Sequence, residues 1–140
     1  SRTTDPLLAA SAEYAESPAE AMLNVLACFL SGSFDARLEF AIRSWALQDP
    51  GVADRVAAAD EARLNALRGM LARWGHPPAE ADVRARTIYL TQIGYISMRA
   101  VEPPETRLAR IPTYVQIYTG HKAEGREIAR FTARVTGQRP

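Results

Sequence analysis

Two helical patterns separated by an Asp-Pro pair occupy residues 34–75, FDARLEFAIRSWALQDPGVADRVAAADEARLNALRGMLARWG. In each half, apolar side chains recur every three or four residues, as on the buried face of a helix. Asp49 is a favoured N-cap, and Pro50 is a favoured first residue of a helix. We therefore expect one helix over residues 34–48 and a second over residues 50–74.

Two charged residues, Arg43 and Asp60, lie among the apolar positions of these helices. A carboxylate on an apolar stripe is costly to bury unless a cation pairs with it. We expect Asp60 to pair with Arg43 across the two helices, with Arg63 as the local alternative partner. The expected role is a structural ion pair that sets how the helices pack, and recognition of a ligand is the alternative role.

Helix start and stop signals recur along the rest of the chain, and no segment has the period-2 alternation of a strand. The sequence therefore predicts an all-α helical bundle of about six or seven helices. The further helices are expected over residues 6–15, 18–31, 79–101, 105–119 and 122–135. Pro112 should kink the helix over 105–119 or delay its start.

Composition places the chain among globular proteins. Its 140 residues, of which 47% are hydrophobic and 24% charged, suit one domain with a sizeable core. A net charge of +1 gives no overall attraction to nucleic acid or to acidic membranes. No apolar run approaches the roughly 20 residues of a membrane span, and the single Cys28 cannot form an intrachain disulfide. These features predict a cytoplasmic protein without a membrane partner.

The helix expected over residues 79–101 is apolar on more than one side, which is typical of burial from two directions. Its small residues Gly94 and Ser97 would let another helix approach closely. Together with the helix over 105–119 it could form a dimeric four-helix bundle with a second subunit. The alternative is a central helix in a monomeric bundle. The residues expected at the dimer interface are Arg86, Leu90, Gly94, Ser97, Val101, Tyr114, Ile117 and Tyr118.

Catalytic motifs are sparse in this sequence. Neither His76 nor His121 belongs to a Glu-x-x-His motif, and no cluster has metal-ligand spacing. A Gly-rich phosphate loop and a G-x-S-x-G elbow are also missing. Cys28 lies in an apolar helix, where a small buried hydrophobe is more typical than a nucleophile. We expect no enzyme, no catalytic residues, no metal and no cofactor.

A small-molecule pocket within the bundle is a further expectation, because large apolar side chains from four of the helices could enclose a cavity. Core packing is the alternative role for each of them. The ligand is expected to be largely apolar or aromatic, with Tyr89, Gln92 or Arg43 as one polar anchor. The candidate pocket residues are Met22, Leu26, Phe29, Phe40, Trp45, Met70, Trp74, Tyr89 and Ile93.

Several short elements occur in a characteristic order along residues 38–95. They are Ala41-Ile42-Arg43 with Trp45, Asp49-Pro50 with Val52, Asp60 with Arg63, Gly75, Ala85-Arg86 and Gly94. This combination resembles the C-terminal regulatory domain of TetR-family (tetracycline-repressor-like) transcriptional regulators, over about residues 18–120. The resemblance implies an all-helical domain that dimerises through its last two major helices and holds a small-molecule pocket.

The resemblance also implies a function: effector sensing and dimerisation within a DNA-binding transcriptional regulator, expected to be a repressor. The family's N-terminal helix-turn-helix has no counterpart here, and SRTTDP at the start suggests a piece of a longer protein. Operator DNA would then be bound only through that missing domain. We expect a connecting segment (1–16), a regulatory and dimerisation domain (17–120) and a basic C-terminal helix and tail (121–140). A small helical enzyme and a ligand-free interaction module are the alternatives.

Overall fold

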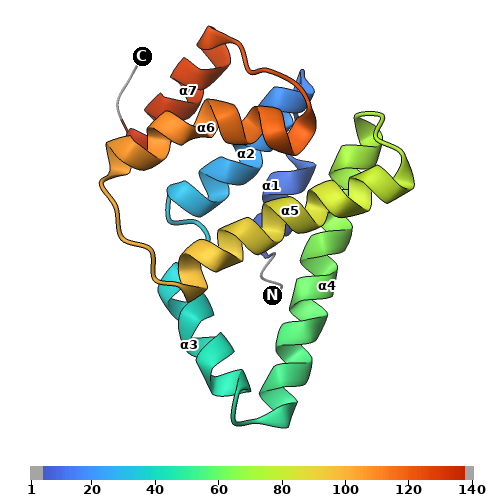
Figure 1. The fold of residues 1–140 in the computed structure, drawn as a ribbon, viewed down its shortest axis with the longest axis vertical. Coiled ribbons are helices and arrows are strands. Elements are labelled where there is room, and N and C mark those ends of the chain that lie inside the picture. Colours follow the sequence, from blue (N-terminus) through green and yellow to red (C-terminus); the bar gives the residue numbers. More distant parts are fainter. Residues whose placement is uncertain (1–4, 138–140) are drawn as a thin grey trace.

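Seven helices and no strand make up residues 5–137, the part of the chain that the computed structural model describes (Figure 1). The all-α prediction is therefore confirmed. The helices are α1 (Pro6–Ala12), α2 (Pro18–Leu30), α3 (Ala36–Ala46), α4 (Pro50–Arg73), α5 (Pro78–Ser97), α6 (Pro104–Thr119) and α7 (Gly125–Thr136). The expected connecting segment and C-terminal tail reach into residues 1–4 and 138–140, which lie outside the described residues.

Most of these helices start with proline at the first helical position, and a side-chain cap precedes that proline in α1, α2 and α4. Proline begins α1, α2, α4, α5 and α6, because its fixed φ suits a helix and its missing N–H is not needed there. At the predicted break, Asp49 accepts hydrogen bonds from the backbone N–H groups of Gly51 and Val52 at 2.9 and 3.2 Å. The boundary between α3 and α4 at Asp49-Pro50 is thus confirmed.

The observed boundaries differ from the predicted ones where a local cap or turn decides them. Helix α3 begins two residues late, because Asp35 caps it and Phe34 turns into the core from the preceding loop. Helix α7 begins at Gly125 because Glu124 and Glu127 form a capping box. Helix α5 ends at Ser97, and α1 ends three residues earlier than predicted. Pro112 lies inside α6 and does not delay its start.

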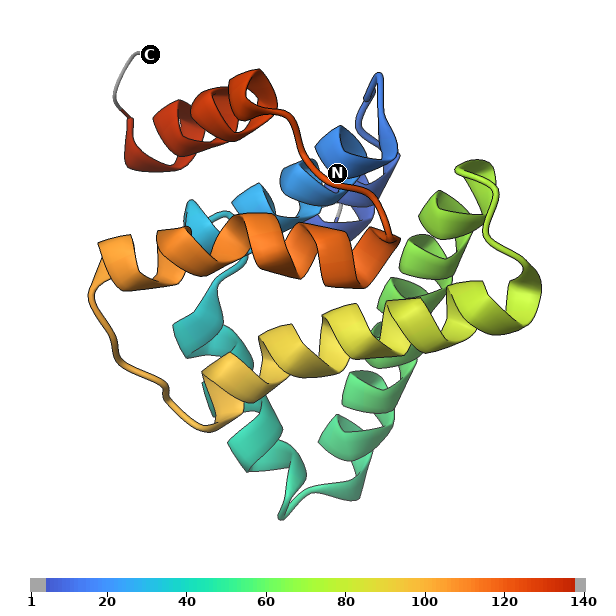
Figure 2. The ribbon, with the colours of Figure 1, turned by 45° about the horizontal axis from the view of Figure 1, so that its top comes forward.

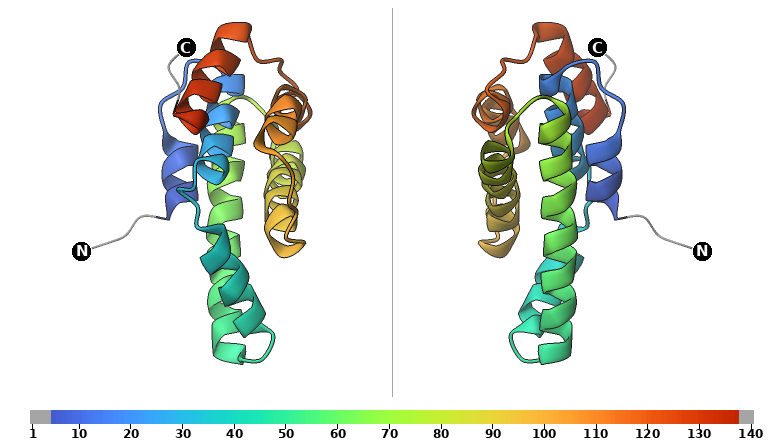
Figure 3. Two further views of the ribbon diagram at one scale, coloured as in Figure 1. Left: turned by 90° about the vertical axis from the view of Figure 1, so that its left-hand side faces the viewer. Right: turned by 90° about the vertical axis from the view of Figure 1, so that its right-hand side faces the viewer.

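The helices form layers, with α5 and α6 as an outer layer on one side (Figure 3). Helices α2 and α4 lie in the middle, and α1 lies on the opposite side. Figure 2 shows α6 running alongside α5, which leaves the outward side of this pair facing away from the rest of the bundle. The arrangement gives α5 and α6 one buried side and one uncovered side.

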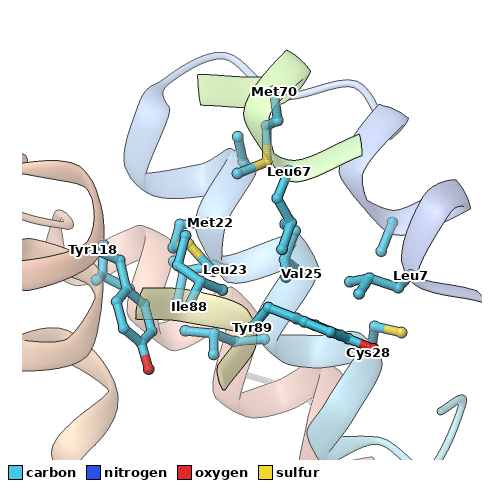
Figure 4. Packing of buried hydrophobic residues seen from close by; sticks show 14 of the residues in the cluster. Leu7, Met22, Leu23, Val25, Cys28, Leu67, Met70, Ile88, Tyr89 and Tyr118 are labelled. Carbon is cyan, nitrogen blue, oxygen red and sulfur yellow. The ribbon is translucent and has the colours of Figure 1, made fainter. Parts of the chain in front are cut away.

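A single hydrophobic core joins all the layers. It extends from Leu7 in α1 to Phe131 in α7, so both terminal helices belong to the same bundle. Figure 4 shows Met22, Ile88, Tyr89 and Tyr118 among the packed side chains of this core. Helix α2 lies at its centre, with residues 21–28 all buried. Within residues 5–137, none of the helices combines the length and the apolar character needed to cross a membrane.

Candidate functional site

A pocket of about 400 Å³ lies between the end of α2, the start of α3, the second half of α5 and the segment that leads into α6. Its volume falls within the usual range of small-molecule sites. Aromatic rings form much of the wall: Phe29 and Phe34 pack with ring centroids 4.8 Å apart, and Phe40 and Tyr95 complete it. The Tyr95 and Tyr114 hydroxyl groups hydrogen-bond at 2.7 Å, which fixes the Tyr95 ring.

Three arginines line the same pocket: Arg37 from α3, Arg99 just after α5 and Arg107 from α6. The Arg99 guanidinium carbon lies 5.1 Å from the Phe40 ring centroid, and that of Arg107 lies 4.2 Å from the Tyr95 ring centroid. These cation–π contacts hold both guanidinium groups against the aromatic wall. Within residues 5–137, none of the three forms an ion pair, and no acidic residue lines the pocket.

The backbone of Arg99 is in the left-handed region, with a φ of 52°. Arg99 follows the C-cap residue of α5, a position where glycine is usual. A non-glycine residue there costs about 1–2 kcal/mol. The chain therefore tolerates local strain at the residue that carries one of the pocket's cations.

A cluster of charged side chains, which we call the ion cluster, lies beside the core where α1, α3, α4 and α5 meet. It contains Arg43, Arg63, Asp5, Glu39, Asp60 and the hydroxyl group of Tyr89. Arg43 donates to Asp60 with both terminal nitrogens and to Glu39 through Nε at 2.8 Å. The expected contact between Arg43 and Asp60 is thus present, and Glu39 is an additional partner.

Arg63 occupies the other half of the ion cluster. It donates to Asp5 at 3.0 Å and to both oxygens of Glu39 at 3.2 Å. The Tyr89 hydroxyl group accepts bonds from Arg63 and Arg43 at 2.9 and 3.1 Å and donates to Asp60. Burial and the bond to Asp60 raise the pKa of Tyr89 above its ordinary value, so the phenol keeps its proton. Helices α1, α3, α4 and α5 are thereby joined at one point.

The structure separates the predicted pocket residues into lining and core. Phe29 and Phe40 line the pocket, and so does the suggested anchor Gln92. The other candidates do not border this pocket: Trp45 lies beside a separate hollow between α3 and α4, and Trp74 beside another near the end of α1. The side chains that fill the core instead of the pocket are Met22, Leu26, Met70, Tyr89 and Ile93. Helical periodicity identifies inward-facing residues but does not show where packing leaves a space.

The predicted interface residues mostly lie on the uncovered side of α5 and α6. Leu90 and Ile117 are 63% and 60% exposed, and Arg86, Gly94 and Ser97 belong to the same side of α5. The half-buried Tyr114 stacks on Tyr118 with centroids 5.3 Å apart.

Two of the interface predictions need correction. Tyr118 is only 1% exposed, so it can contribute nothing to a contact with a second chain. Its hydroxyl group instead accepts a hydrogen bond from the buried Gln92 at 3.2 Å. Val101 lies beyond the end of α5, where it borders the pocket, because α5 ends four residues earlier than predicted.

Sequence reasoning missed the pocket's cations and half of its aromatic wall. The missed residues are Phe34, Arg37, Tyr95, Ile96, Arg99 and Arg107. One signal was present: Arg37 and Arg107 have no acidic residue three or four positions away, unlike the paired Arg84 and Arg86. The signal is weak, because Arg55 shares it.

Cys28 and the two histidines do not border the pocket. Cys28 is buried, and burial raises the pKa of its thiol to about 11. The His76 ring nitrogen Nδ1 lies 2.9 Å from Glu80, and its ring packs edge-on to His121. Across residues 5–137, no three side chains of the metal-binding types come together to hold an ion.

Comparison with protein-family models, with curated proteins and with solved structures found no match. The resemblance to TetR-family regulators therefore stays a prediction from the sequence.

Proposed function

We propose that this chain is the effector-sensing and dimerisation domain of a DNA-binding transcriptional regulator of the TetR type. The observation that carries the proposal is the double role of α5. Gln92, Tyr95 and Ile96 on its inward side line the pocket. Val83 and Leu90 lie on its opposite, uncovered side and are 62% and 63% exposed. One helix thus borders both a ligand-sized pocket and an unpaired apolar face.

The uncovered face of α5 and α6 has the character of a contact with a second copy of the chain. Val83 and Leu90 of α5 and Ile117 of α6 have large, exposed apolar side chains. Large apolar patches commonly mark interfaces on soluble proteins, and in the proposed dimer these side chains would be covered by the second chain. A face built from two neighbouring helices can pair with itself about a two-fold axis to give a four-helix bundle.

Gly94 supports this choice of partner. A Cβ atom added at Gly94 would meet no atom within 4 Å, so packing inside the chain does not require glycine there. Glycine inside a helix costs about 1 kcal/mol relative to alanine. A close approach by the backbone of a second helix would account for that cost.

The shared helix also suggests how a ligand could act on the parent regulator. A compound bound against Gln92 and Tyr95 favours one position of α5 over another, and the opposite side of α5 belongs to the proposed interface. Binding that differs between two arrangements of an interface shifts their populations. A change at this interface would in turn move the two DNA-binding domains of the dimeric regulator relative to each other.

Gly94→Leu is expected to raise the dimer dissociation constant at least tenfold, because a leucine side chain would hold the two α5 helices apart. Light scattering and sedimentation over a concentration series measure this constant. Gly69→Leu in α4 is the matched control, since it is also a glycine inside a helix but lies away from the face. A monomeric parent chain at high micromolar concentration, or equal dimerisation of the two variants, would contradict the proposed interface.

The regulatory role itself can be tested in cells by fusing the chain to a helix-turn-helix head that represses its operator only as a dimer. The parent fusion and its Gly69→Leu variant should repress a reporter gene, and the Gly94→Leu fusion should not. Equal reporter expression with all three fusions would count against a dimerising regulatory domain.

A further inference from the structure

We propose that the pocket is specific for organic acids, namely compounds with one carboxylate group attached to an apolar, aromatic body. This inference rests on the proposed sensing function and names the class of ligand that the pocket would sense. It revises the expectation of a largely apolar ligand, because the polar part of the site is cationic.

The charged side chains of residues 5–137 that line the pocket are all positive. Arg37, Arg99 and Arg107 border it, and no carboxylate of the described residues 5–137 does. The nearby acid Glu102 is already engaged with Arg110 at 2.8 Å, and the carboxylate of Asp35 caps α3 at 3.0 Å. Nine other arginines among residues 5–137 form ion pairs. Within residues 5–137, no carboxylate forms an ion pair with the three pocket arginines. Their guanidinium groups are therefore available to an anionic ligand.

The arginines are also held in place for binding. Arg99 and Arg107 lie against the Phe40 and Tyr95 rings, so less side-chain freedom is lost when a ligand arrives. A guanidinium group donates two parallel hydrogen bonds to a carboxylate, and neutral groups cannot replace the charge in this contact. Arg99 also lines the pocket from a backbone in the left-handed region.

The rest of the pocket wall is apolar and would favour a ligand with an apolar body. Phe29, Phe34 and Ile96 present apolar surface between the arginines and the core. Flat aromatic groups pack well against such rings, at centroid separations of about 4.5–7 Å. A ligand with its carboxylate against the arginines and its aromatic body against the apolar wall would satisfy both parts of the pocket.

The test compares 2-naphthoate with 2-naphthamide, which have the same ring system but differ in charge. Isothermal titration with the 140-residue chain should give an affinity for the acid at least tenfold higher than that for the amide. Arg99→Gln with Arg107→Gln should remove this preference. Arg55→Gln is the matched control, because Arg55 is also without an ion pair but borders a separate hollow between α3 and α4. It should leave both affinities unchanged.

Salt gives an independent readout, since raising it should weaken binding of the acid and leave the amide unaffected. Equal affinities for acid and amide would overturn the inference and leave the sensing function intact. Failure of the acid to bind at about 5 mM would also overturn it. The proposed function fails separately, through a monomeric parent chain or an unaffected Gly94→Leu variant, and neither result depends on the naphthalene compounds.

Discussion

Arg63→Met is expected to lower the free energy of unfolding by about 3 kcal/mol, because it removes one of the two cations of the ion cluster. The side chains of Arg63 and Glu39 are only 11% and 10% exposed, so water cannot replace the lost contacts. Methionine fills a similar volume but donates nothing to Asp5, Glu39 or Tyr89. Urea unfolding followed by circular dichroism measures the change.

Two further variants show whether the stability lost in Arg63→Met comes from a buried carboxylate that is left without its cation. Arg68→Met removes an arginine that pairs with Glu61 and Asp82 near the surface, and the loss should be much smaller. The double variant Arg63→Met/Glu39→Met should be more stable than Arg63→Met alone, because it also removes a stranded carboxylate. If Arg63→Met costs no more than Arg68→Met, the ion cluster does not fix the packing of these helices.

The helical framework could be predicted from the sequence because its main signals are local. Proline at the first position marks five helix starts, and the caps Ser17 and Asp49 act within three residues of themselves. The contact of Arg43 with Asp60 was also predictable, since both charges interrupt apolar stripes on consecutive helices. Arg63, Glu39 and Tyr89 belong to the same cluster because of the way in which α3, α4 and α5 cross. The periodic pattern of the sequence carries no information about how helices cross.

The pocket was less predictable because it arises where packing is incomplete. Met22 and Met70 have the same residue type and periodicity that a pocket lining would have, yet both are buried in the core. Arg37, Arg99 and Arg107 come from separate elements, and α5 ends earlier than its apolar pattern suggests. That early end places Arg99 in the lining of the pocket, and only the course of the chain after Ser97 reveals it.

Met22→Ala is expected to lower the free energy of unfolding by about 2–5 kcal/mol, because it leaves a cavity in the centre of the core. Met22 is fully buried in α2 and belongs to the same core cluster as Leu67 of α4 and Ile88 of α5 (Figure 4). Phe40→Ala, in contrast, removes a half-buried ring at the pocket wall and should cost clearly less stability. Thermal and urea unfolding of both variants give the comparison.

The same two variants should affect ligand binding in the opposite order. Phe40 supports the Arg99 guanidinium group and contributes to the aromatic wall, so Phe40→Ala should weaken binding of 2-naphthoate at least tenfold. Met22→Ala, measured where it is still folded, should leave that affinity within about twofold because no Met22 atom borders the pocket. A variant at Met22 that loses binding while remaining fully folded would place the ligand in the core, as the periodicity alone suggested, and would remove the pocket from the proposed sensing role.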